Sequence, residues 1–170
     1  ATIKAAFTAL ATENNYNLVE AKVAVLNEKG TYDAASTKAD ALDAAGTSVA
    51  AKITALSGIT DYAGFIAGIE AITDVNLDAA ALAEVLTVAK NVTEDECKSG
   101  DAFDLGTAQA AANGKITAKG YAAAKTTATA NKTLAGNINT AVAALTGLNT
   151  KAEYDAAIDG ISVASTGATD

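Results

Sequence analysis

The chain has 170 residues, a formal net charge of −8 and no His, Met, Trp or Pro, and its 12 basic residues are all lysine. Without imidazole, Ser-His-Asp and Cys-His relays cannot be built, and a typical zinc site lacks its ligands. Without arginine, and with an acidic surface, a groove that binds nucleic acid is not expected. We therefore expect no enzyme, no cofactor and no nucleic-acid partner.

Alanine dominates the sequence, and this favours helices over strands. Alanine is depleted in strands, and no long stretch alternates cleanly between apolar and polar residues. The sequence predicts an all-α fold, an elongated Ala-rich helical bundle whose core packs alanine against Leu, Ile and Val. A β-rich fold is the alternative, because threonine is frequent and glycines divide the chain into short pieces.

The first predicted elements are a helix over Ile3–Leu10 and a long helix over Tyr32–Leu56. Thr31 is its expected N-cap, and Ser57-Gly58 is its expected end. Within the long helix, small or apolar residues recur at alternating steps of four and three residues and form one stripe. Its members are Ala35, Ala39, Leu42, Gly46, Val49, Ile53 and Leu56. We expect Gly46→Leu to cost several kcal/mol by overpacking this inward face, and Ala50→Leu to be mild.

A short amphipathic helix is predicted next, and a bridging helix follows it over residues 76–92. The apolar positions of the short helix are Tyr62, Phe65, Ile66, Ile69 and Ile72. After the bridge, residues 93–104 form the densest acidic segment. We expect a solvated turn in which Thr93 and Glu96 make a capping box. Weak Ca²⁺ binding is the alternative, although no frame places ligands as an EF-hand requires.

The second half of the chain repeats the first. A second long helix is predicted between Ala118 and Leu145, with the same stripe 89 residues later. Its members are Ala124, Ala128, Asn131, Ala135, Ile138, Val142 and Leu145. Thr146-Gly147 then repeats Ser57-Gly58, and a second short helix begins near Tyr154. This predicts two related units of helix, long helix and short helix, divided as residues 1–75, a bridge over 76–92, and residues 93–170.

Three polar residues stand out as candidate sites. Cys97 is the only cysteine. We interpret it as a small, partly buried side chain with a pKa raised by its acidic neighbours, and the alternative is a thiol that pairs between chains. Asn91 begins an Asn-X-Thr triplet at an expected helix end and could carry a glycan if the producing cell glycosylates. Asn131 begins a second triplet, but its inward position suggests a role in helix register.

We interpret the chain as a non-catalytic structural or cell-surface protein that assembles with copies of itself into a filament, fibre or layer. It begins at Ala1 without an initiator methionine. We read this as signal-peptide removal and expect an extracellular or cell-surface location. No stretch is long enough to span a membrane. The alternative is a monomeric secreted helical module that binds a host protein, a glycan or a small apolar ligand.

Overall fold

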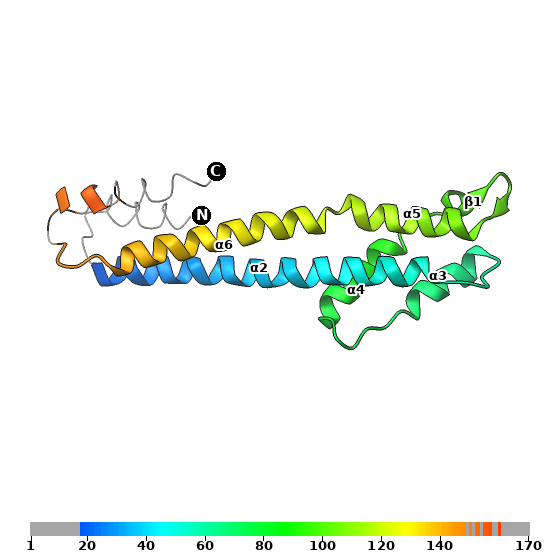
Figure 1. Cartoon of the computed structure of the whole chain (residues 1–170), viewed down its shortest axis with the longest axis horizontal. Helices are drawn as coiled ribbons and strands as arrows, with labels where there is room; N and C mark the ends of the chain where they lie inside the picture. The colour runs from blue at the N-terminus through cyan, green and yellow to red at the C-terminus, as the bar shows by residue number, and fades with distance from the viewer. Residues whose placement is uncertain (1–17, 149, 151, 154, 158–159, 161–170) are drawn as a thin grey trace. The chain divides into compact units, whose positions relative to one another are not determined.

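The computed structural model describes residues 18–148, 150, 152–153, 155–157 and 160, with side chains described from residue 27 onward. The helix predicted over Ile3–Leu10 lies outside this part of the chain. The described elements follow one another in the order shown in Figure 1. They are α2 (Leu18–Thr54), α3 (Tyr62–Glu70), α4 (Ala79–Ala89), η1 (Asp95–Cys97), β1 (Lys98–Ser99), β2 (Ala102–Phe103), α5 (Leu105–Ala118) and α6 (Tyr121–Ala143).

The mostly helical structure confirms the all-α prediction. Within the described residues, strands occur only in the hairpin of β1 and β2, where Lys98 lies opposite Phe103. Its turn contains Gly100, whose positive φ of 67° suits a tight two-residue turn. None of the described helices has the length and apolar character needed to cross a bilayer.

Spatial contacts divide the chain into two compact units. The first combines residues 1–37 with residues 126–170, and the second contains residues 38–125. α2 and α6 each contribute to both units. This division follows packing in space, whereas the boundaries expected from the repeat (1–75, 76–92 and 93–170) follow the sequence, and that repeat stays a prediction.

α2 begins well before the predicted long helix. Thr31 lies inside it, and its hydroxyl donates to the Asn27 carbonyl at 3.4 Å, so its assignment as an N-cap was wrong. The preceding residues include strong helix formers such as Ala, Leu, Glu and Lys, which carry the helix through Gly30. α2 ends at Thr54, close to the predicted end, and Gly58 follows with a φ of 70°.

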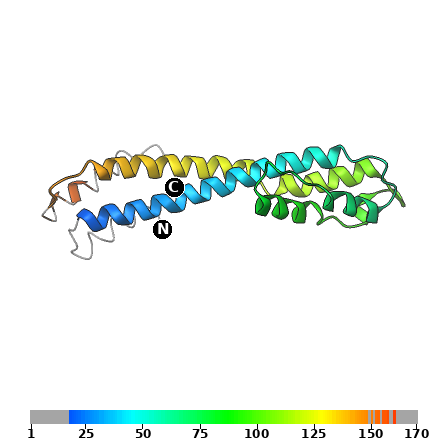
Figure 2. The same cartoon turned by 90° about the horizontal axis from the view of Figure 1, so that it is seen from below.

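One cluster of buried hydrophobic side chains lies in the second unit. α2 contributes Ala45, Val49 and Ile53, each with no exposed surface. In Figures 1 and 2, α3, α4 and α5 lie along this half of α2. Their buried residues are Phe65, Ile69, Ala81, Val85, Ala89, Ala108, Ala112 and Ile116. Many of these side chains are small, so the helices can approach closely while each side chain buries little area.

Gln109 of α5 helps to end α2. Its side-chain amide donates to the carbonyls of Ile53 at 3.0 Å and Leu56 at 2.9 Å. The last carbonyls of a helix have no partner within the helix, and a side chain from a neighbouring helix supplies one here. The sequence predicted where this helix ends. It did not predict the contact from α5 that stabilises the end.

α6 is the second predicted long helix, and its bounds lie within a few residues of the predicted ones. α5 ends at Ala118 and α6 begins at Tyr121, and between them Gly120 has a φ of 65°. α6 buries Ala135, Ile138 and Val142 within the first unit. Asn131 is exposed, as is Ala124, so the inward register role expected for Asn131 was wrong. Alanine occurs on several faces of this helix, so the apolar pattern did not show which face of its first turns points inward.

Candidate functional site

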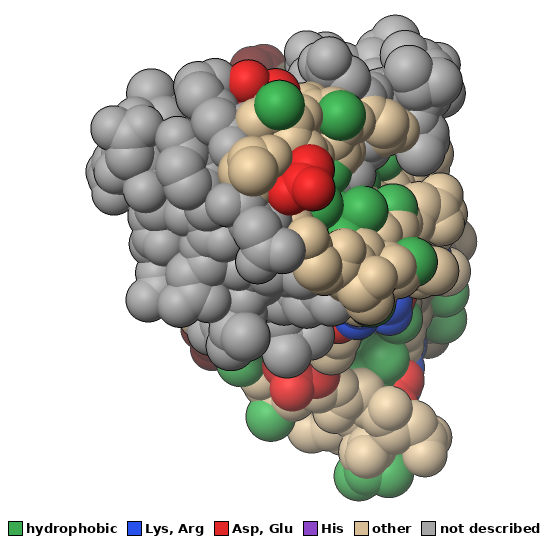
Figure 3. All heavy atoms as spheres, turned by 90° about the vertical axis from the view of Figure 1, so that its left-hand side faces the viewer, with side chains coloured by type: hydrophobic (Ala, Val, Ile, Leu, Met, Phe, Trp, Pro, Cys, Tyr) green, Lys and Arg blue, Asp and Glu red, His purple; other side chains and the backbone are tan. Residues whose placement is uncertain are grey.

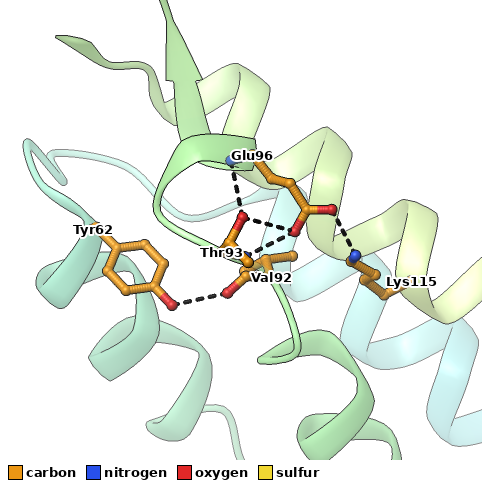
Figure 4. Close-up of polar contacts among 5 residues, drawn as sticks. All are labelled: Tyr62, Val92, Thr93, Glu96 and Lys115. Atoms are coloured by element: carbon orange, nitrogen blue, oxygen red, sulfur yellow. Dashed lines mark hydrogen bonds and ion pairs between the residues drawn. The ribbon is translucent and has the colours of Figure 1, made fainter. Parts of the chain in front are cut away.

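The candidate site is a group of polar residues where α3, α4, η1 and α5 meet, and we call it the polar junction. It consists of Tyr62, Val92, Thr93, Glu96 and Lys115. Figure 4 shows that these residues come from segments separated in sequence and point toward one another. All five lie in the second unit.

Thr93 and Glu96 form the predicted capping box. The Thr93 amide donates to Glu96 Oε2 at 2.8 Å, and the Glu96 amide donates to Thr93 Oγ1 at 3.3 Å. The two residues thus satisfy each other's backbone donors at the start of η1. The hydroxyl of Thr93 also approaches Glu96 Oε2 at 3.3 Å.

Lys115 joins the capping box to α5. Its Nζ lies 2.6 Å from Glu96 Oε1, the carboxylate oxygen that the box leaves free. The hydrogen bond from Lys115, followed by the one from the Thr93 amide, lowers the pKa of Glu96 below its ordinary value. Glu96 therefore stays ionised and fixes the acidic segment to α5. It is no general acid at neutral pH.

Tyr62 joins the same segment to α3. Its hydroxyl donates to the Val92 carbonyl at 2.8 Å, while Val92 itself is buried. This tyrosine packs its ring against the core and uses its polar end to bind a backbone carbonyl. The sequence indicated the packing of Tyr62 but gave no signal for this bond, nor for the pairing of Lys115 with Glu96.

Cys97 lies beside the junction and is fully buried. Burial is the main reason that its pKa is raised, and the charges of Glu96 and Glu94 add to the effect. The raised pKa was predicted, but from charge alone. A thiol with no exposed surface cannot reach another chain unless the surrounding packing opens, and this favours the interpretation as a packed side chain.

Asn91 is exposed directly after α4. The third residue of its triplet, Thr93, holds the capping box together. Asn91 is thus accessible for a glycan, and its modification stays a prediction.

Three other acidic residues of the segment 93–104 make local contacts. Lys98 pairs with Asp95 at 3.0 Å and with Glu94 at 3.3 Å. Asp104 is the N-cap of α5, where its carboxylate accepts from the Thr107 amide at 2.7 Å, and this bond lowers its pKa. No group of three potential metal-binding side chains occurs in the described part of the chain. The turn predicted here is present, together with the short hairpin.

Two open grooves lie in the second unit. The first, of about 280 Å³, is lined by small residues of α2 together with Ile116 and Tyr121. The Tyr121 hydroxyl is buried without a hydrogen-bond partner in the described structure, and burial raises its pKa. The second groove, of about 700 Å³, is lined by Thr87, Val88, Lys90, Asn91, Lys115, Ala118 and Lys119. We call it the lysine groove.

The polar junction joins α3, η1 and α5. Its carboxylate, ammonium and hydroxyl are each bonded to a partner within the protein. Comparisons with protein-family models, with curated proteins and with solved structures give no match.

Proposed function

We propose that this chain is a non-catalytic structural subunit that assembles with copies of itself at a cell surface or outside the cell. The observation that carries the proposal is a recurrence of local geometry at an interval of 89 residues. An extracellular location is supported by the composition alone, which lacks several of the larger residue types.

The recurrence begins at the ends of the two long helices. α2 ends at Thr54 and α6 ends at Ala143, 89 residues later. Gly58 and Gly147 follow at the same interval with φ values of 70° and 68°. Because only glycine adopts this conformation readily, the match does not arise from alanine content.

The next helix start also recurs. Asp61 caps α3 by accepting from the Gly64 amide at 2.7 Å. At the equivalent position Thr150 forms a capping box with Glu153, through bonds of 2.9 Å and 3.3 Å. The buried positions preceding these turns match as well. They pair Gly46 with Ala135, Val49 with Ile138, and Ile53 with Val142. These matches support two related units of long helix, turn and short helix.

A repeated unit bears on assembly because it gives one chain two related surfaces. Related surfaces favour head-to-tail contacts, which propagate unless the rotation closes a ring. The small side chains of the core bury limited area within one chain. Burial between copies would add to stability as concentration rises.

Size-exclusion chromatography with light scattering tests the proposal. We expect the full chain to elute as an oligomer or polymer whose mass increases with protein concentration. A constant monomer mass up to millimolar concentration would favour the alternative, a monomeric helical binding module.

A further inference from the structure

We propose that Asn113 is a site of spontaneous covalent modification, at which conversion of its side-chain amide to a carboxylate loosens the joint between α5 and the end of α2. Asn113-Gly114 is the one Asn-Gly pair in the sequence. Because glycine has no side chain, its backbone nitrogen can approach the preceding side chain with little hindrance. We therefore expect Asn113 to be the most reactive asparagine of the unfolded chain.

The reaction consumes water and needs no enzyme or cofactor. The Gly114 nitrogen attacks Cγ of Asn113, a new C–N bond forms, and the side-chain nitrogen leaves as ammonia with the proton that the Gly114 nitrogen gives up. Water then opens the cyclic succinimide. Opening at Cγ gives aspartate, and opening at the backbone carbonyl carbon gives isoaspartate. Either product has gained water, lost ammonia and acquired a carboxylate.

The folded structure protects Asn113 from this reaction. Asn113 and Gly114 lie inside α5, where a helical backbone directs each N–H toward the carbonyl four residues earlier. The Asn113 side-chain amide donates to Thr54 Oγ1 of α2 at 3.0 Å, and the Asn113 carbonyl accepts from the Thr117 hydroxyl at 2.9 Å. Closure of the succinimide ring therefore requires this part of α5 to open.

The hydrogen bonds around Thr54 explain why an amide is needed at this position. The Thr54 hydroxyl donates to the Ala50 carbonyl at 2.9 Å, so its oxygen is left to accept from Asn113. The Asn113 Oδ1 atom is buried without a hydrogen-bond partner in the described structure. A carboxylate has no proton to donate, so it would place an oxygen against the Thr54 oxygen with no hydrogen bond between them.

The end of α2 also disfavours a negative charge beside it. Asn113 lies one turn along α5 from Gln109, whose amide donates to the carbonyls of Ile53 and Leu56. The last carbonyls of a helix carry the negative end of its dipole. The amides of Gln109 and Asn113 are donors that suit this helix end, whereas a carboxylate would be repelled by it. Deamidation would therefore weaken the joint.

Ageing of the full chain tests whether Asn113 is the site. Samples are kept folded in buffer or unfolded in concentrated urea at mildly alkaline pH, and peptide mass spectrometry follows the conversion of each asparagine. In urea we expect Asn113 to be converted first, and Gly114→Ala to slow its conversion, because the added methyl group hinders the attack. In buffer we expect conversion at least about tenfold slower, because only the open fraction of the chain reacts.

Three results of the ageing experiment would overturn the proposal. They are conversion of another asparagine before Asn113 in urea, no effect of Gly114→Ala in urea, and equal rates in buffer and in urea.

Asn113→Asp tests the consequence of the modification, with Asn131→Asp as its control. Both variants place a carboxylate within a helix, but Asn131 is exposed on α6. Acidic side chains are already scattered over the described part of the surface in Figure 3, so an additional exposed one should change stability little. We expect Asn113→Asp to raise the equilibrium constant of unfolding by at least about fivefold, because a donor is lost where an acceptor remains.

Urea unfolding followed by circular dichroism measures both variants, and a Thr54→Ala background identifies the cause. Thr54→Ala removes the oxygen that faces the carboxylate, so Asn113→Asp should cost less in this background than in the wild type. Wild-type stability of Asn113→Asp, equal losses in Asn113→Asp and Asn131→Asp, or additive losses in the cycle would overturn the proposal.

Discussion

Replacing Gly46 with leucine tests the packing of α2 against the start of α6 within the second unit. A Cβ added at Gly46 would lie 3.2 Å from Tyr121 Cδ2 and 3.6 Å from Ile116 Cγ2. The first distance is already tight, and leucine adds three further carbons. We expect overpacking to cost about 1–3 kcal/mol, offset in part by about 0.8 kcal/mol from the better helix propensity of leucine. The net loss should be about 0.2–2.2 kcal/mol, smaller than the several kcal/mol expected from the sequence.

The control chosen from the sequence, Ala50→Leu, must be replaced. Ala50 is half-buried and lines the same groove as Gly46, so it does not represent the outward face. Ala51 is exposed, and Ala51→Leu should change the unfolding free energy by less than about 0.5 kcal/mol.

Urea unfolding followed by circular dichroism measures these losses, and a double-mutant cycle identifies their cause. If the Tyr121 ring is the obstacle, Gly46→Leu should cost less in a Tyr121→Ala background than in the wild type. Equal losses for Gly46→Leu and Ala51→Leu, or additive losses in the cycle, would refute the proposed packing.

Three further predictions concern the second unit. The folded pKa of Glu96 is lowered, so its contribution to stability is complete above its unfolded pKa and is lost as pH falls through the folded value. Urea midpoints of Glu96→Gln should therefore fall less than those of the wild type between neutral and acidic pH, and parallel curves would contradict this. Cys97 should react slowly with a thiol reagent until denaturant is added, and rapid labelling of the native protein would show that it is accessible. Gly114→Ala, inside α5 with open space around the new methyl group, should raise the unfolding free energy by up to about 1 kcal/mol. Gly120→Ala should lower it by about 1 kcal/mol because its φ of 65° disfavours a side chain, and thermal unfolding of both would test the pair.

The sequence predicted those features that depend on local chemistry. The short helix α3 and its buried Phe65 and Ile69 follow from apolar spacing that alanine does not blur. The capping box of Thr93 and Glu96 follows from two side chains three residues apart. The turn at Gly58 follows from the conformational freedom of glycine.

The features that depend on tertiary contacts were not predictable in the same way. Where alanine and other helix formers are frequent, the sequence fits several helix starts and several inward faces. The early start of α2 and the exposed Asn131 both lie in such regions. The bonds from Tyr62 to Val92 and from Lys115 to Glu96 join segments that are distant in sequence. Nothing in the local pattern specifies which neighbour these side chains would meet.

Sedimentation velocity of the full chain, from micromolar to millimolar concentration, tests self-assembly most directly. The account predicts sedimentation coefficients that increase with concentration, as copies associate by mass action. A single, concentration-independent species with the mass of one 16.8 kDa chain would contradict it.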